Sequence, residues 1–203
     1  MARPRSFDLD DALAAATRVF LLRGFDGATL DDLTQAMGVN KPSLYAAFGD
    51  KGTLYAKALG GYAAMATSAM QAALNTGDTL EQAGRNLLLG AIEVYAPARG
   101  EHLGCLIATT ATTVAGSDPA VRKAVAAFLS SIDRMIEATI ERRFGENLSE
   151  KGVASAAAVL SATMYSLAIR ARAGAPKKQL MSITEDAIDT VSVIAEAQAR
   201  PAS

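Results

Sequence analysis

The sequence predicts an all-helical protein of about nine helices. Half of its 203 residues are hydrophobic, and alanine and leucine dominate this half, whereas aromatic residues make up 5% and tryptophan is absent. Alanine and leucine are strong helix formers, and strands are usually rich in β-branched and aromatic residues. Apolar residues also recur at helical spacing along most of the chain. A chain of this length can form one large domain or two small ones.

The first predicted helix spans about residues 9–23. Asp8, Asp10 and Asp11 lie at its start, where negative charge favours the positive end of the helix dipole. Six residues recur at a spacing that turns most of them toward one core: Ala12, Leu13, Ala16, Val19, Phe20 and Arg23.

A second, short helix begins after Thr29. Asp32 follows Thr29 by three residues, as in a capping box in which Asp replaces the usual Glu or Gln. Gly38 then stands where a left-handed residue can end the helix, and Val39 can fill the corner that follows. The apolar face of this helix consists of Leu30, Leu33 and Met37.

The third helix has one buried face and one small, polar and basic face. Pro42 suits the first turn of a helix, and Leu44 and Phe48 lie four residues apart on its inner side. Two short helices joined by a glycine turn predict a helix-turn-helix that places this face in the DNA major groove. An ordinary helical hairpin is the alternative. The outward residues are Lys41, Ser43, Ala46 and Ala47.

Caps and breaks define six further helices. Asp50 caps a fourth helix that reaches about residue 74 and carries Leu54, Ala58, Tyr62, Met65 and Ala69 along one face. Thr79 and Gln82 form a capping box for a fifth helix that ends near residue 95. The others span about residues 104–115, 119–144, 149–173 and 178–198, and they are separated by glycine and proline.

Composition excludes several classes of protein. The net charge is −1, so the chain is not a polycation, although Asp50 is the only acid between Lys41 and Lys57. No apolar run reaches the ~20 residues that cross a bilayer. The first residues lack the apolar core of a signal peptide, and a single cysteine cannot form an internal disulfide. These features predict a cytoplasmic protein. No catalytic motif stands out, so we expect neither an enzyme nor a cofactor.

The segment from Phe7 to about Leu59 resembles the N-terminal domain of TetR-family (tetracycline-repressor-like) transcriptional regulators. Thr34 stands where the family has a small alanine, and threonine is small enough to keep the packing. The motif covers about a quarter of the chain, and the rest matches only in length and helical character. The matching residues are Phe20, Gly24, Phe25, Thr29, Leu30, Leu33, Gly38, Val39, Leu44, Tyr45, Phe48, Lys51 and Leu54.

The predicted DNA contacts fall into two groups. Lys41, Ser43 and Ala46 are candidates for base edges, and Pro42 and Ala47 can add apolar contacts. The second group faces the backbone. By resemblance to the family tyrosine, Tyr45 binds a phosphate, and Thr29 and Lys51 stand at helix starts that favour one. Arg3 and Arg5 can follow the backbone or enter the minor groove.

The resemblance implies a DNA-binding domain at residues 1–50 and a ligand-binding and dimerisation domain at residues 51–203. The helices at 149–173 and 178–198 carry more apolar surface than one core needs, which favours a four-helix bundle shared by two subunits. A large monomeric core is the alternative. In such a dimer the recognition helices lie ~34 Å apart and match an inverted-repeat operator of double-stranded DNA.

The resemblance also implies a small-molecule inducer among the later helices. The candidate lining is apolar with hydroxyl groups, which favours a neutral or weakly polar ligand, although methionines and aromatic residues at helical spacing are more often plain core. The repressor role is likewise an implication of the family. The candidates are Met65, Leu88, Tyr95, Cys105, Leu106, Thr109, Phe128, Met135, Met164 and Tyr165.

Cys105 admits three other interpretations. With His102 and Glu101 it could contribute to a metal site, but one histidine and one cysteine leave such a site incomplete. It could be a thiol that senses electrophiles or oxidants, or a small buried residue in a packing segment. Two further hypotheses are a helical small-molecule carrier that does not bind DNA and a DNA-organising protein without a ligand.

Overall fold

The computed structural model describes residues 7–97 and 100–200, and within these parts the chain is helical. An isolated bridge between Leu148 and Ala199 is the one β-type pairing in the described residues. The all-helical prediction is therefore confirmed. The elements are α1 (Leu9–Gly27), α2 (Leu30–Met37), α3 (Lys41–Phe48), α4 (Lys51–Leu74), α5 (Leu80–Tyr95), the π-helix η1 (Leu106–Ala111), α6 (Thr112–Ala115), α7 (Pro119–Phe144), α8 (Glu150–Arg172) and α9 (Lys177–Ala197).

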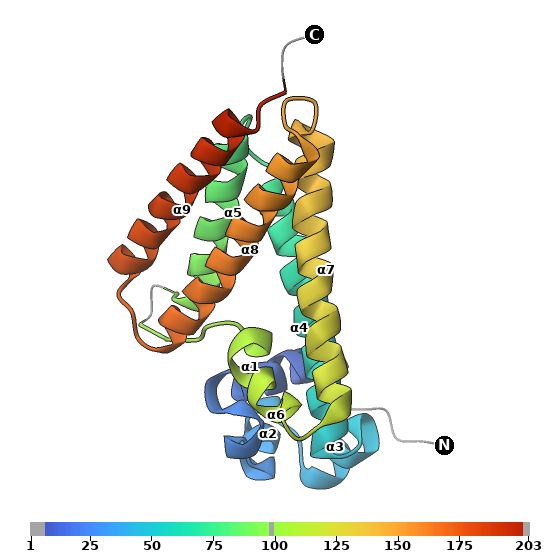
Figure 1. The fold of residues 1–203 in the computed structure, drawn as a ribbon. Helices are drawn as coiled ribbons and strands as arrows, with labels where there is room; N and C mark the ends of the chain where they lie inside the picture. Colours follow the sequence, from blue (N-terminus) through green and yellow to red (C-terminus); the bar gives the residue numbers. More distant parts are fainter. Residues whose placement is uncertain (1–6, 98–99, 201–203) are drawn as a thin grey trace.

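The helices form a small N-terminal group and a larger group above it (Figure 1). α1, α2 and α3 pack together at the lower end, and α4 and α7 rise from there side by side. α5, α8 and α9 pack against one another in the upper part. α1 also contacts α4 and η1, so the hydrophobic core continues from one group into the other.

The predicted helix starts are confirmed by side-chain caps. The Asp50 carboxylate accepts from the amide of Thr53 at 2.7 Å, and the Thr79 hydroxyl accepts from the amide of Gln82 at 3.3 Å. Asp118 and Ser149 cap α7 and α8 in the same way. Each cap satisfies an amide that has no partner within its helix.

α4 buries the predicted face as far as Tyr62 and a different one after it. Met65 is 58% exposed and Ala69 is exposed, whereas Ala66 and Met70 are buried. The buried stripe recurs every four residues, at Ala58, Tyr62, Ala66 and Met70, and so drifts around the helix. The prediction switched to a three-residue step after Tyr62, and it was wrong from that point.

The predicted helix at 104–115 begins as a π-helix. η1 covers Leu106–Ala111, and only the four residues of α6 that follow are α-helical. The hydroxyls of Thr109 and Thr110 donate to the carbonyls of Cys105 and Leu106, both at 2.5 Å. Side chains that bond to carbonyls four residues back compete with the regular ladder and distort helices.

α8 alone among the described helices is long and apolar enough to cross a membrane by length and composition. Half of its apolar window is buried inside the fold, and it packs against α5, α7 and α9. α8 is therefore the core helix of a helical bundle.

Candidate nucleic-acid interface

α2 begins with a complete capping box. The Thr29 hydroxyl accepts from the amide of Asp32 at 3.1 Å, and the Asp32 carboxylate accepts from the amide of Thr29 at 3.1 Å. The same carboxylate lies 2.8 Å from the Arg23 guanidinium. The hydrogen bonds from Thr29 are the main reason why the pKa of Asp32 is lowered, and Arg23 adds to the effect. The start of α2 is thus fixed to the end of α1.

The turn between α2 and α3 is fixed at both ends. Gly38 has φ 66° and ψ 28°, a left-handed conformation that glycine adopts without strain, and the amide of Val39 donates to the carbonyl of Thr34 at 3.0 Å. Asn40 then caps α3, because its side chain accepts from the amide of Ser43 at 2.9 Å. Sequence reasoning missed Asn40, although asparagine is a preferred N-cap residue.

The two predicted faces of α3 are present. Leu44 and Phe48 are buried, with exposures of 0% and 4%. Tyr45 is 48% exposed, and the remaining predicted contact residues of α3 are exposed or half-buried. Lys41, Pro42 and Ala46 are exposed, whereas Ser43 and Ala47 are half-buried.

Two lysines border this face in different surroundings. The Lys41 ammonium lies 2.7 Å from the Asp31 carboxylate, whose hydrogen bond and negative charge raise the pKa of Lys41. The Lys51 ammonium lies 4.6 Å from the centre of the Phe25 ring. Thr29 is exposed, and Lys51 is half-buried at the start of α4. Arg3 and Arg5 lie outside the described residues.

Comparisons with known proteins identify the family of this chain. The model of the family "Bacterial regulatory proteins, tetR family" matches residues 12–58. A structure of the TetR family transcriptional regulator CifR, bound to 26-bp double-strand operator DNA, is 30% identical with a TM-score of 0.82 and covers 92% of this chain and 98% of that one. The chain belongs to the TetR family. It is a DNA-binding transcriptional repressor, and this family is not enzymatic.

Two curated repressors of Escherichia coli strain K12 are also similar. The repressor BdcR is 26% identical over 194 residues, which cover 96% of this chain and 94% of BdcR. The repressor ComR is 26% identical over 183 residues, which cover 89% of this chain and 87% of ComR. The similarity therefore extends well beyond the helix-turn-helix into the upper helices.

The predicted ligand residues of this TetR-family repressor differ in their surroundings. Met65 lies on the exposed side of α4, and Phe128 lines the large groove between α4 and α7. The others are core residues or half-buried. Leu88, Tyr95, Cys105, Leu106 and Met164 are buried, and Thr109, Met135 and Tyr165 are half-buried.

Tyr62, Tyr95 and Tyr165 lie near Cys105, which is 1% exposed. Burial raises the pKa of Tyr62, and the adjacent Cys105 thiol raises it further. Burial and the same thiol raise the pKa of Tyr95, and burial is the main cause that raises the pKa of Tyr165 to about 12. In the described part of the chain, no group of three histidine, cysteine or acidic side chains could hold a metal ion. Glu101 pairs instead with Arg18.

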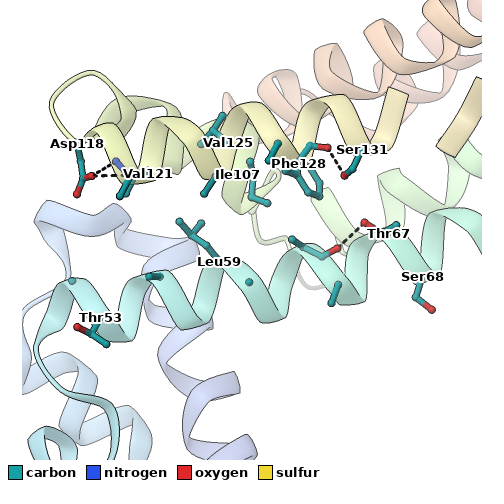
Figure 2. Close-up of a pocket in the computed structure, with 18 of the residues that line it drawn as sticks. Thr53, Leu59, Thr67, Ser68, Ile107, Asp118, Val121, Val125, Phe128 and Ser131 are labelled. Carbon is teal, nitrogen blue, oxygen red and sulfur yellow. Dashed lines mark hydrogen bonds between the residues drawn. The ribbon is translucent and has the colours of Figure 1, made fainter. Parts of the chain in front are cut away.

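A groove of about 1200 Å³ runs between α4 and α7. Figure 2 shows it extending from Thr53 and Asp118 at one end to Ser68 and Ser131 at the other. Many of the side chains that line it are small. The sequence alone did not predict this groove, because its two walls lie about 60 residues apart in the chain. The middle is lined by Ala56, Leu59, Gly60, Ala63, Ala64, Ile107, Val121, Ala124, Val125, Ala127 and Phe128.

Proposed function

We propose that this repressor acts in the cytoplasm as a homodimer, binds an inverted-repeat operator through α3, and is released by a small molecule. The observation that carries the proposal is the exposed face of α3, a helix whose own start and whose preceding helix α2 are both capped. A recognition surface held by Thr29 and Asn40 is preorganised, so little order has to be gained on binding DNA. CifR, which has the same fold, binds double-strand operator DNA.

On the operator, Lys41, Ser43 and Ala46 would read base edges, with Pro42 and Ala47 in apolar contact. Tyr45, Thr29 and Lys51 would bind phosphates and set the register of the protein on the duplex. Asp31 holds Lys41 in the free protein, so Lys41 must exchange this carboxylate for a guanine acceptor when it enters the groove.

The proposed dimer forms through α8 and α9. Three of the exposed large hydrophobic side chains lie on these helices: Ile169 at 57%, Met181 at 45% and Val193 at 64%. Ala154, Ala158 and Ala162 are exposed on α8 and would let a second helix approach closely. A two-fold axis through this surface would produce the symmetric pair of α3 helices that an inverted repeat requires.

The inducer is proposed to occupy the groove between α4 and α7. Its apolar middle suits an apolar body, and three donors at one end have no protein partner among the described residues: Ser68, Gln71 and Arg134. The hydroxyls of Thr67 and Ser131 already donate to the carbonyls of Ala63 and Phe128. A ligand that widens the groove would displace α4, whose first residue follows α3 by three positions.

A thiol sensor is the second candidate, favoured by the tyrosines around Cys105. Tyr62 and the thiol are adjacent, and a phenol hydroxyl can donate a hydrogen bond to a cysteine sulfur. Modification of Cys105 would need room in a filled core and would therefore disturb η1, which begins at the next residue.

Selection of bound sequences from a random duplex pool, at two salt concentrations, tests the DNA-binding proposal. We expect an inverted repeat. Lys41→Ala should relax the base preference and weaken specific binding by ~1–3 kcal/mol if the lysine contact is bidentate. Lys123→Ala, an exposed lysine on α7, is the matched control and should change neither. No enrichment would remove the operator proposal and favour the carrier hypothesis.

Two pairs of proteins separate the two triggers. Ala124→Leu fills the groove, and Ala126→Leu adds the same volume on α7 outside it. If the groove binds the inducer, apolar alcohols and carboxylic acids should release DNA from Ala126→Leu but not from Ala124→Leu. If the thiol is the trigger, N-ethylmaleimide should release the unaltered protein but not Cys105→Ser. Release of both members of a pair would contradict the corresponding candidate.

A further inference from the structure

α1 is interrupted three residues before its end. Gly24 has φ 72° and ψ 179°, which is not helical and which residues with a side chain rarely adopt. In an unbroken helix the carbonyls of Leu21 and Leu22 accept from the amides of Phe25 and Asp26. Those are the two residues directly after Gly24, so the regular ladder is disturbed at these carbonyls.

Arg172 supplies donors at the same two carbonyls. Its Nη1 donates to the carbonyl of Leu21 at 2.7 Å, and its Nη2 donates to the carbonyl of Leu22 at 2.9 Å. Arg172 is the last residue of α8, about 150 positions away in sequence. A guanidinium presents its donors in a planar fork, which suits two neighbouring carbonyls better than a single ammonium does.

The same arginine also holds the loop that leads into η1. Its Nη1 lies 3.4 Å from the carbonyl of Leu103. Gly104 has φ +64°, and a Cβ there would lie 2.8 Å from the carbonyl oxygen of Ala168 and 3.1 Å from the Cβ of Arg172. The loop therefore lies directly against the last turns of α8. Cys105 and η1 follow immediately.

We propose that Arg172 is a positioning residue for DNA binding: it joins the end of α8 and the loop before Cys105 to the break in α1, and so fixes the helix-turn-helix relative to the upper helices. This inference rests on the proposed dimer at an inverted repeat, because two recognition helices must hold one spacing. Arg18 on α1 pairs with Glu101 in the same loop, which adds an exposed second link between these elements.

Loss of this fork leaves the DNA-contacting residues in place and loosens their attachment. Two helix-turn-helix units that fluctuate independently lose more conformational freedom when both half-sites bind, so operator affinity falls. Arg172 contacts no predicted phosphate ligand, so the number of counterions released on binding does not change.

Arg172→Gln is the test, with Arg170→Gln as the matched control. Arg170 lies two residues earlier on α8, and its Nε donates only to the Ser166 hydroxyl of its own helix, at 3.1 Å. For Arg172→Gln we expect roughly tenfold weaker binding to the selected operator with an unchanged salt slope. Amide hydrogen exchange should accelerate in residues 21–28 and 103–110 but not in α9. Arg170→Gln should match the unaltered protein, and Arg172→Lys should recover part of the affinity.

Three outcomes would overturn the inference. Unchanged exchange in both segments would show that the fork fixes nothing, and faster exchange with unchanged affinity would make it a stabilising contact only. If the dependence of operator affinity on salt concentration fell by the equivalent of about one phosphate contact, Arg172 would be a residue that contacts DNA. The exchange measurement needs no DNA. A failure to select an operator would therefore count against the proposed function and leave the exchange result to decide whether Arg172 holds α1.

Discussion

Two regions of this repressor, the N-terminal group and the groove between α4 and α7, depend on the sequence in different ways. In the N-terminal group, each turn depends on residues within four positions of one another: Thr29 with Asp32, Gly38 with Gln35, and Asn40 with Ser43. The groove between α4 and α7 instead depends on small side chains that come together only when the helices pack. The recognition surface is therefore locally specified, whereas the proposed ligand site is a product of tertiary structure.

The largest expected effect tests whether this difference extends to folding. Leu44 in α3 and Leu160 in α8 are both fully buried. Replacing either with alanine should lower the free energy of unfolding by ~2–5 kcal/mol, through lost burial and the cavity left behind. Because the core continues from α1 into α4 and η1, we expect each variant to shift one shared transition, measured by circular dichroism in urea.

Two transitions, each sensitive to one variant only, would contradict that expectation. They would show that the two groups of helices unfold separately, and they would support two independently folding domains with a boundary near residue 50. Tyr45→Ala is a suitable control, because this side chain is 48% exposed and its loss should leave unfolding nearly unchanged.

Sequence reasoning succeeded where one short segment contains the whole signal. Asp50, Thr79 and Pro119 mark helix starts that the structure confirms, because a cap is a contact between near neighbours. The inner residues of α3, Leu44 and Phe48, follow from the helical period alone. The fold class and the recognition helix could be predicted for this reason.

It failed where partners are distant. Met65 was expected on the apolar face of α4 because of its helical spacing from Tyr62, but the packing of α4 buries Met70 instead. The π-helix could not be predicted from the spacing of apolar residues, because over six residues this spacing is similar in an α-helix and in a π-helix. No local pattern connects Arg172 with Leu21, and their contact depends on where α8 ends. The candidate recognition face was thus predictable, and the groove was not.

A smaller effect concerns the charge next to the recognition helix. Asp31→Asn removes a carboxylate that lies 2.7 Å from the Lys41 ammonium and that is itself repelled by phosphates. We expect operator affinity to rise by about two- to fivefold at low salt, measured by fluorescence anisotropy, since exposed ion pairs contribute little. Glu146→Gln, in the turn after α7, is the distant control. A weaker operator complex for Asp31→Asn would show that Asp31 orients Lys41 for binding and does not compete with DNA.

The smallest effect is a pH dependence of the cap at the start of α2. The hydrogen bonds from Thr29, with Arg23, lower the pKa of Asp32 in the folded protein. Its contribution to stability is therefore present above the unfolded value of about 3.9 and is lost as the pH falls through the lower folded value. Asp32→Asn should lower the melting temperature by a few degrees at pH 7, and this difference should shrink as the pH falls from the unfolded value through the lowered pKa of Asp32 in the folded protein. Asp78→Asn, whose carboxylate accepts no hydrogen bond in the described part of the chain, should show no such convergence. A difference for Asp32→Asn that persists in acid would mean that the charge of Asp32 is not what holds α2 to α1, and the shape of the side chain at the cap would have to account for it.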